Sequence, residues 1–249
     1  MQIKLILLCL IAHVLGDYYF QNDEMSQLKK EKISGVIKHS VYYSIPFIAV
    51  WIFINESFKL LIFLCLTHFI IDFVKYIVYK MYTNKLNYSY KNILSINVKT
   101  WIIYLFDQLL HIISIFILVY YFSNSLDINF TLIEKILNID ILFILKWILI
   151  IICIHKPANI TFKKIFSNNK PKEKSVNNNK NGAIIGFLER FIIAIFLYVN
   201  QYSAIGFVLT AKSIARYNKI SENAEFGEYY LIGTLYSTLF IVVIFNLIF

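Results

Sequence analysis

The stretch that decides the fold is Thr67-His68-Phe69-Ile70-Ile71-Asp72-Phe73-Val74-Lys75, inside a long apolar segment at residues 58–79. His68 and Asp72 are four residues apart, so on a helix they lie one turn apart on the same face. A carboxylate at the centre of a bilayer costs about 2.5–3.5 kcal/mol on insertion scales, and such groups usually face the interior of a helix bundle or a water-filled cavity. We therefore expect other helices to bring polar partners to this pair.

The composition is that of a membrane protein. Hydrophobic residues make up 59% of the 249 residues, whereas soluble domains average about 45–50% even when glycine is counted. The net charge of +9 comes mainly from lysines between the apolar segments. This pattern favours a lipid bilayer with anionic lipids as the partner and argues against nucleic acid. The cysteines Cys9, Cys65 and Cys153 lie singly in apolar runs and predict neither disulfides nor a zinc pair.

Seven apolar segments predict an all-α polytopic membrane protein with about seven transmembrane or re-entrant helices. They are residues 3–20, 33–54, 58–79, 100–122, 139–154, 183–210 and 226–249. Most approach the ~20 residues that a helix needs to cross a bilayer. The first segment has some features of a signal peptide. Its apolar run extends to Phe20 and its polar pattern recurs later, so we expect it to remain as the first spanning helix.

We expect four regions along the chain. They are an N-terminal four-helix bundle that carries a His/Asp cluster at 1–125, a fifth helix at 126–156, a basic disordered linker at 157–182 and a C-terminal helical membrane unit at 183–249. The linker is rich in lysine and asparagine and has no helical periodicity.

Lysines predict the orientation in the membrane. They gather after the first, third and fifth segments, so by the positive-inside rule these loops are cytoplasmic and the N-terminus lies outside. A single crossing by the sixth segment would place Lys212, Arg216 and Lys219 outside. A break at Asn200-Gln201 that turns the chain back returns them to the cytoplasm, and we favour that version.

Ionisable residues recur at a spacing of four inside the first four segments. Three His/Asp pairs and one further histidine form the set: His13, Asp17, His39, His68, Asp72, Asp107 and His111. With a rise of about 1.5 Å per residue, the expected topology puts them all in one band toward the cytoplasmic side. Imidazole and carboxylate groups are ligands for divalent metals, and two ligands one helical turn apart can hold one ion. We therefore predict a divalent metal site, with zinc as the first candidate.

The predicted chemistry is metal-dependent hydrolysis. Water bound to the metal would attack an ester, amide or phosphoester in a lipid or membrane-associated substrate, with Asp72 or Asp107 as the general base. Gln21, Lys75 and Gln108 are expected to support the ligands. The same cluster also allows a proton- or ion-coupled transporter, or a scaffold in which it only joins helices. A single polar band favours a site over a through-path.

Charged residues also mark the C-terminal segments. Arg190 follows Glu189 near the start of the sixth segment, and Lys212 and Arg216 are four apart. The basic residues could bind a lipid phosphate or a nucleotide. Interhelical ion pairing is the alternative that we favour. His155 is expected at the membrane interface and not as a ligand.

The motifs resemble the bacterial membrane-protein family catalogued as domain of unknown function 3307. The likeness lies in His13-Val-Leu-Gly-Asp17-Tyr-Tyr-Phe-Gln21, in His39, in the stretch from Thr67 to Lys75 and in Asp107-Gln108-Leu-Leu-His111. Motifs at 186–190, 201–216 and 228–234 are similar to the tail of longer members. The resemblance implies a multi-pass protein of the bacterial inner membrane. A weaker likeness to proteins described as membrane-bound metal-dependent hydrolases agrees with the predicted chemistry.

Overall fold

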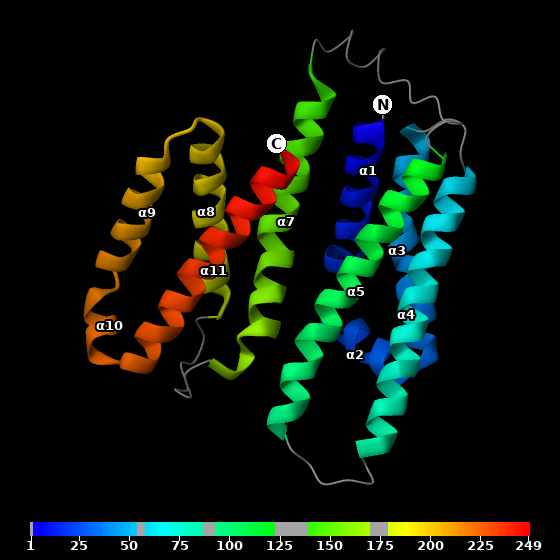
Figure 1. Ribbon diagram of the computed structural model, residues 1–249, viewed down its shortest axis with the longest axis horizontal. Helices are drawn as coiled ribbons and strands as arrows, with labels where there is room; N and C mark the ends of the chain where they lie inside the picture. The colour runs from blue at the N-terminus through cyan, green and yellow to red at the C-terminus, as the bar shows by residue number, and fades with distance from the viewer. Residues whose placement is uncertain (1, 54–57, 87–92, 123–138, 170–178) are drawn as a thin grey trace. The chain divides into compact units, whose positions relative to one another are not determined.

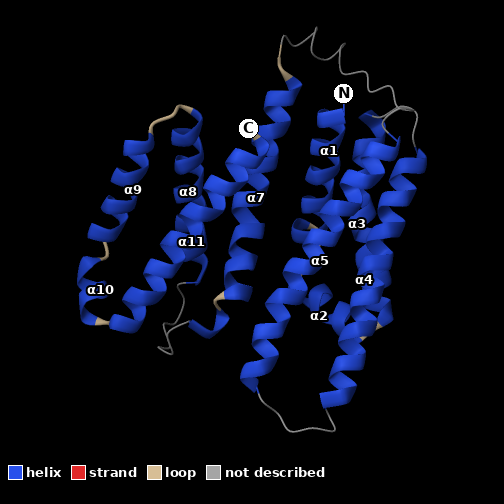
Figure 2. Ribbon diagram, in the orientation of Figure 1, coloured by secondary structure: helices blue, strands red, loops and turns tan. Residues whose placement is uncertain are grey.

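The computed structural model describes residues 2–53, 58–86, 93–122, 139–169 and 179–249. Every regular element within these residues is a helix, which confirms the all-α prediction (Figures 1 and 2). The chain divides into two compact units, Met1–Leu149 and Ile150–Phe249. The division falls inside helix α7 (Ile141–Ile165), before the linker that we expected to separate them.

The N-terminal unit is built on four long helices. They are α1 (Gln2–Val14), α3 (Ile33–Phe53), α4 (Phe58–Leu86) and α5 (Ile93–Phe122). Helix α1 packs against α3 and α5, α3 packs against α4, and α4 packs against α5 (Figure 1). Each helix therefore has two neighbours, and the polar residues that face inward from all four can meet.

A short amphipathic helix, α2 (Asp23–Glu31), lies where the sequence suggested only a lysine-rich loop. The side chain of Asn22 caps it by accepting a hydrogen bond from the Met25 amide at 2.8 Å. Acidic residues occupy the first turn and lysines the last, which suits the helix dipole. Met25 is buried, and α2 packs against α3 and α4. Hydropathy missed this helix because most of its residues are polar.

In the C-terminal unit, the sixth apolar segment forms two helices. Helix α8 (Asn179–Tyr198) and helix α9 (Tyr202–Ile214) pack against each other. Asn200 between them has a φ of 56°, a left-handed conformation that asparagine tolerates better than most residues. The predicted break with a return of the chain is thus confirmed. Helix α10 (Tyr217–Glu222) leads into α11 (Ala224–Ile248), which packs against α8 and α10.

The fifth helix is longer than we predicted. Helix α7 continues through Pro157 to Ile165, and the 3-10 turn η3 (Ser167–Asn169) follows. The expected linker at 157–182 is therefore wrong for its first nine residues, and also for 179–182, which begin α8. The apolar run ends at Lys156 and Pro157, which suggested the start of a linker, but the helix continues past both residues. Residues 170–178 lie outside the described part of the chain.

Five of the described helices are long and apolar enough to cross a membrane. They span Gln2–Tyr19, Phe58–Met81, Trp101–Phe122, Ile141–Ile165 and Ala224–Ile248. Their outward-facing side chains are large and apolar, as with Ile70, Phe106 and Leu239, which are 55%, 60% and 64% exposed. These features fit a multi-pass membrane protein whose solvent is lipid. Helices α3 and α8, which belong to the seven predicted segments, are not among the five.

A candidate metal centre in the N-terminal unit

The four packed helices bring all seven predicted His/Asp residues into one buried cluster. His13 lies in the last turn of α1, His39 lies on α3, His68 and Asp72 lie on α4, and Asp107 and His111 lie on α5. Asp17 follows on the π-helical turn η1 (Leu15–Tyr19). The four imidazoles are at most 2% exposed. The ring centroids of His13, His68 and His111 are 4.2 to 6.0 Å apart, so the three rings converge.

The π-helical turn η1 gives Asp17 its position. Its wider turn closes with a bond from the Phe20 amide to the Leu15 carbonyl at 2.9 Å, and such turns are frequent at functional sites. Gly16 lies against the ring of Tyr43, and a Cβ at this position would be 2.5 Å from Tyr43 Cδ2. Only glycine permits this close approach between η1 and α3.

Tyr43 fills the space between two of the histidines. Its hydroxyl is hydrogen-bonded to His13 Nδ1 at 3.1 Å, and its ring stacks on that of His68 with centroids 3.4 Å apart. Because Tyr43 is 2% exposed, neighbouring residues restrict its movement. The tyrosine thereby sets the orientation of both imidazoles.

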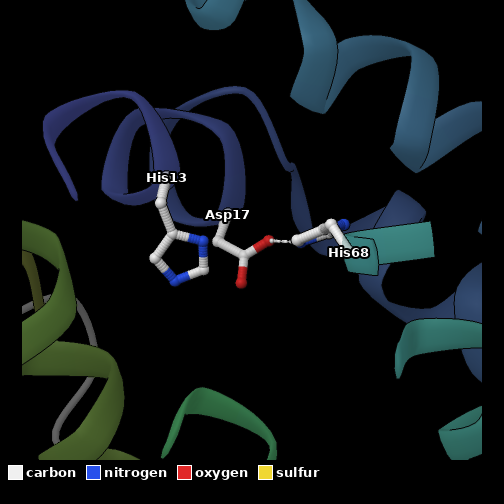
Figure 3. A group of neighbouring side chains, drawn as sticks. All are labelled: His13, Asp17 and His68. Carbon is white, nitrogen blue, oxygen red and sulfur yellow. Dashed lines mark hydrogen bonds and ion pairs between the residues drawn. The ribbon is translucent and has the colours of Figure 1, made fainter. Parts of the chain in front are cut away.

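Asp17 is the hydrogen-bonding centre of the cluster. Its Oδ1 accepts from His68 Nε2 at 2.9 Å and from His39 Nε2 at 3.1 Å. Its Oδ2 accepts from Gln108 Nε2 at 3.0 Å. Figure 3 shows the His13 ring beside the Asp17 carboxylate, with the dashed contact running from Asp17 to His68. Asp17 therefore joins α3, α4 and α5, and its bonds run to other helices instead of to the His13 side chain four residues before it.

Asp72 and Asp107 each divide their two oxygens between a lysine and His111. Asp72 Oδ2 is 2.5 Å from Lys29 Nζ on α2, and Asp107 Oδ2 forms an ion pair with Lys75 of α4. Their Oδ1 atoms lie 3.9 Å and 3.6 Å from His111 Nε2. These three atoms are buried and have no hydrogen-bond partner among the described residues. A buried polar atom without a partner costs about 1–3 kcal/mol.

Three overlapping groups have the composition and closeness that a metal ion needs. They are His13, Asp17 and His68; His39, His68 and Asp72; and Asp72, Asp107 and His111, with ligand atoms within 4.8 Å of one another in each group. Zinc–nitrogen and zinc–oxygen bonds of about 2.0–2.2 Å put tetrahedral ligands about 3.4 Å apart. The third group fits best, because its separations of 3.6 and 3.9 Å join unpartnered atoms. The second group also has an unpartnered pair, His68 Nδ1 and Asp72 Oδ2 at 3.7 Å, but its His39 approaches Asp72 through Nε2, which is already bonded to Asp17. In the first group, Asp17 Oδ1 and His68 Nε2 are bonded to each other.

The structure places two of the three expected supporting residues at the cluster. Lys75 pairs with Asp107, and Gln108 donates to Asp17 while accepting from the Tyr18 hydroxyl at 3.0 Å. Gln21 follows η1 and takes part in none of the contacts above. Lys29 was counted only as a charge that reports topology, and its role was missed. The spacing of four between Met25 and Lys29 would have indicated a shared inward face once α2 was recognised.

Two adjacent charged residues of the C-terminal unit, Glu189 and Arg190, are buried. Arg190 is 3% exposed. It donates to the Ile154 carbonyl at 2.8 Å and to Asn159 Oδ1 and Ser237 Oγ, each at 2.9 Å. Its position on α8 thus ties three helices together.

Lys212 of α9 forms an ion pair with Glu189 of α8, which is the interhelical pairing that we favoured. It also donates to Thr234 Oγ1 at 3.1 Å. Arg216 lies 6.0 Å from the centroid of the Tyr230 ring, and binding of a phosphate by these basic residues stays a prediction. His155 is exposed on α7 with its ring edge-on to Phe187 at 5.1 Å and is not one of the residues of the His/Asp cluster.

Comparison with known proteins finds one family. The model described as "Protein of unknown function (DUF3307)" matches residues 5–139, which include all seven residues of the cluster. No curated protein and no solved structure matches the chain. The likeness to metal-dependent hydrolases is therefore not shown by any comparison. Since the match covers more than half of the 249 residues, the chain belongs to the DUF3307 family.

Proposed function

We propose that the protein binds one divalent metal ion, with zinc as the first candidate, between Asp72, Asp107 and His111. The observation that carries the proposal is the meeting of three buried, unpartnered ligand atoms from α4 and α5. A bound cation would give each of these atoms a partner. It would also offset the cost of keeping carboxylates within hydrocarbon.

The charges of the cluster support a cation. The carboxylates of Asp17, Asp72 and Asp107 and the ammonium groups of Lys29 and Lys75 leave one net negative charge when the four imidazoles are neutral. In an interior of low dielectric constant, an uncompensated charge is costly. The two lysines therefore reduce the negative charge without removing it, and a metal ion has an electrostatic reason to bind.

We further propose that the bound ion serves hydrolysis of a lipid or membrane-associated substrate. A divalent metal supplies Lewis acidity and a water whose proton is easily lost. Because both carboxylates would hold the ion through Oδ1, the general-base role predicted for Asp72 or Asp107 would fall to an Oδ2 atom, which is the atom that faces a lysine. Asp17, held by His39, His68 and Gln108, keeps the four helices in register around the site.

The proposed setting is the bacterial inner membrane. In this arrangement the N-terminal unit is a four-helix membrane bundle, the N-terminus lies outside and the lysine-rich loops are cytoplasmic. The lysines of α2 support this orientation, because α2 packs beside the cluster and carries Lys29 and Lys30 in its last turn. The cluster would then lie toward the cytoplasmic side.

Metal analysis of purified protein tests the proposal. Wild-type protein in detergent is loaded with Zn²⁺, freed of excess ion and analysed by mass spectrometry for metal per chain. We expect one ion per chain in the wild type and in His155→Ala, a control outside the cluster. We expect at least a tenfold loss of affinity in His111→Ala, as for changes around other metal sites. A folded wild type without metal, or equal affinity in His111→Ala, refutes the proposal.

A proton pathway is the second candidate, and one observation favours it. His39, Asp17 and His68 form a hydrogen-bonded chain, and Asp72 lies 3.4 Å from His39 and 3.7 Å from His68. Such a chain can pass a proton without any ion. Proteoliposomes that contain a pH-sensitive dye would show uptake of protons by wild type and not by Asp17→Asn. Uptake with no bound metal would favour this function over the hydrolase.

A further inference from the structure

We propose that the substrate of the metal site is a phosphodiester with one negative charge, held by Lys75 and Lys29. The inference rests on the proposed function and names the substrate class of the same site. The observation behind it is that each carboxylate that would bind the ion also forms an ion pair with a lysine: Asp72 with Lys29, and Asp107 with Lys75.

The geometry links the lysines directly to the candidate metal position. Asp72 and Asp107 turn Oδ1 toward His111 and Oδ2 toward a lysine. Each ammonium group is therefore separated from the metal position by one carboxylate. In the proposed complex, an anionic group that binds the ion through one oxygen turns its other oxygens toward the ammonium groups of Lys29 and Lys75. Lysine is a common phosphate ligand in proteins, so this arrangement suits a phosphoryl group better than a neutral carbonyl.

The lysines are also the most accessible charged members of the cluster. The side chain of Lys75 is 31% exposed and that of Lys29 is 12% exposed, whereas those of Asp72 and His111 are 0% and 1% exposed. A substrate that approaches the metal position from the exposed edge of the cluster would meet an ammonium group first. An anionic group is attracted at this edge, and a neutral ester gains nothing from it.

Charge balance selects a diester over a monoester. One divalent ion changes the net charge of the cluster from −1 to +1 when the imidazoles are neutral. A phosphodiester carries one negative charge and brings the sum to zero. A phosphomonoester carries about 1.5 to 2 negative charges at neutral pH and would leave the buried site negative. A neutral substrate would leave it positive.

The proposed step is a hydrolysis and needs no other reactant. The oxygen of a water molecule forms a bond to phosphorus, and one ester P–O bond breaks. The leaving oxygen takes a proton and departs as an alcohol, while the other product is a phosphomonoester. The water supplies both the hydroxyl group on phosphorus and the proton on the alcohol, so atoms and charges balance.

The test compares three substrates with Zn²⁺-loaded protein in mixed micelles. Bis(4-nitrophenyl) phosphate is a soluble diester, phosphatidylglycerol is a lipid diester, and 4-nitrophenyl acetate is a neutral ester. The variants are Lys75→Met, Lys75→Arg and, as a control on the same helix, Lys80→Met, whose ammonium group lies over the Tyr76 ring and outside the cluster. Metal content is measured for every sample.

We expect the wild type to hydrolyse a diester. Lys75→Met should raise the KM for the diester at least tenfold, whereas Lys75→Arg should keep it within threefold of the wild-type value. Lys80→Met should leave it unchanged. Hydrolysis of either diester supports the inference. The diester that is hydrolysed faster shows whether the substrate is a lipid or a soluble phosphodiester. Metal-loaded protein that cleaves only the acetate refutes the inference alone. An equal effect of Lys75→Met on the KM for the acetate and on the KM for the diester also refutes the inference alone. A folded chain that holds no metal refutes the proposed function and this inference with it.

Discussion

Replacement of Gly16 by alanine tests whether the close contact between η1 and α3 holds the cluster together. The added Cβ would lie 2.5 Å from Tyr43 Cδ2, 3.1 Å from Cε2 and 3.2 Å from Cγ. Ordinary contact begins at 3.4 Å, so the ring must move by about 0.9 Å to accept the methyl group. The ring lacks free space for that movement, because it stacks on His68 and is 2% exposed.

The expected destabilisation by Gly16→Ala is about 1.5–4.5 kcal/mol, the sum of two contributions. Overpacking of a filled interior costs about 1–3 kcal/mol. Movement of the ring also weakens the 3.1 Å hydrogen bond between the Tyr43 hydroxyl and His13, a loss of about 0.5–1.5 kcal/mol. Tyr43→Phe removes the hydroxyl alone, so its smaller effect measures the second contribution separately.

Thermal unfolding in detergent provides the assay, with a thiol-reactive dye as the probe. Cys9 is buried, and Cys65 and Cys153 are half-buried, so their reaction reports loss of structure. We expect the midpoint of Gly16→Ala to fall by at least about 5 °C. Gly206→Ala is the matched control, because a Cβ at Gly206 in α9 has nothing within 4 Å. A Gly16→Ala variant that melts like the wild type and like this control would refute the packing argument.

Three further substitutions test local features of the fold by the same assay. A Cβ at Gly35 would lie 2.4 Å from the Leu28 carbonyl carbon, so Gly35→Ala should displace the α2 backbone, cost about 1–3 kcal/mol and speed proteolysis of α2. Asn200→Ala places alanine at a φ of 56° and should cost about 1–2 kcal/mol, whereas glycine should cost less. Arg190→Met leaves three acceptors, two of them buried, without this donor, so we expect a loss above about 3 kcal/mol, against almost none for Lys219→Met at an exposed position.

The meeting of the seven His and Asp residues in one cluster could be predicted, because it depends only on their spacing along each helix and on their depth in the membrane. A separation of four residues fixes the face of a helix, and the direction of each helix fixes the depth of its polar pair. The break at Asn200 was predictable for a similar reason. Two adjacent polar residues inside an apolar segment interrupt it, and the lysines that follow require the chain to turn back.

The partners within the cluster could not be predicted, because they depend on tertiary contacts. Spacing suggested that His13 would pair with Asp17, but His13 bonds to Tyr43 while Asp17 bonds to His39 and His68. The π-helical turn after His13 changes the direction of Asp17, and nothing in the pattern of apolar residues reports such a turn. Lys29 was missed for a related reason, since hydropathy does not detect a polar helix that packs beside the membrane segments.

The overlap of the three candidate ligand groups limits how many ions the proposed metal site could hold. His68 belongs to two groups and Asp72 to two, so only the groups of Asp17 and of Asp107 share no residue. A second ion would have to displace the hydrogen bonds that Asp17 receives from His39 and His68. It would also change the net charge of the metal-loaded cluster from +1 to +3 in a medium where repulsion between charges is strong. Both effects favour a single ion beside His111 in the proposed site, where Asp17 and its partners would hold the four helices together and Asp72 and Asp107 would bind the metal.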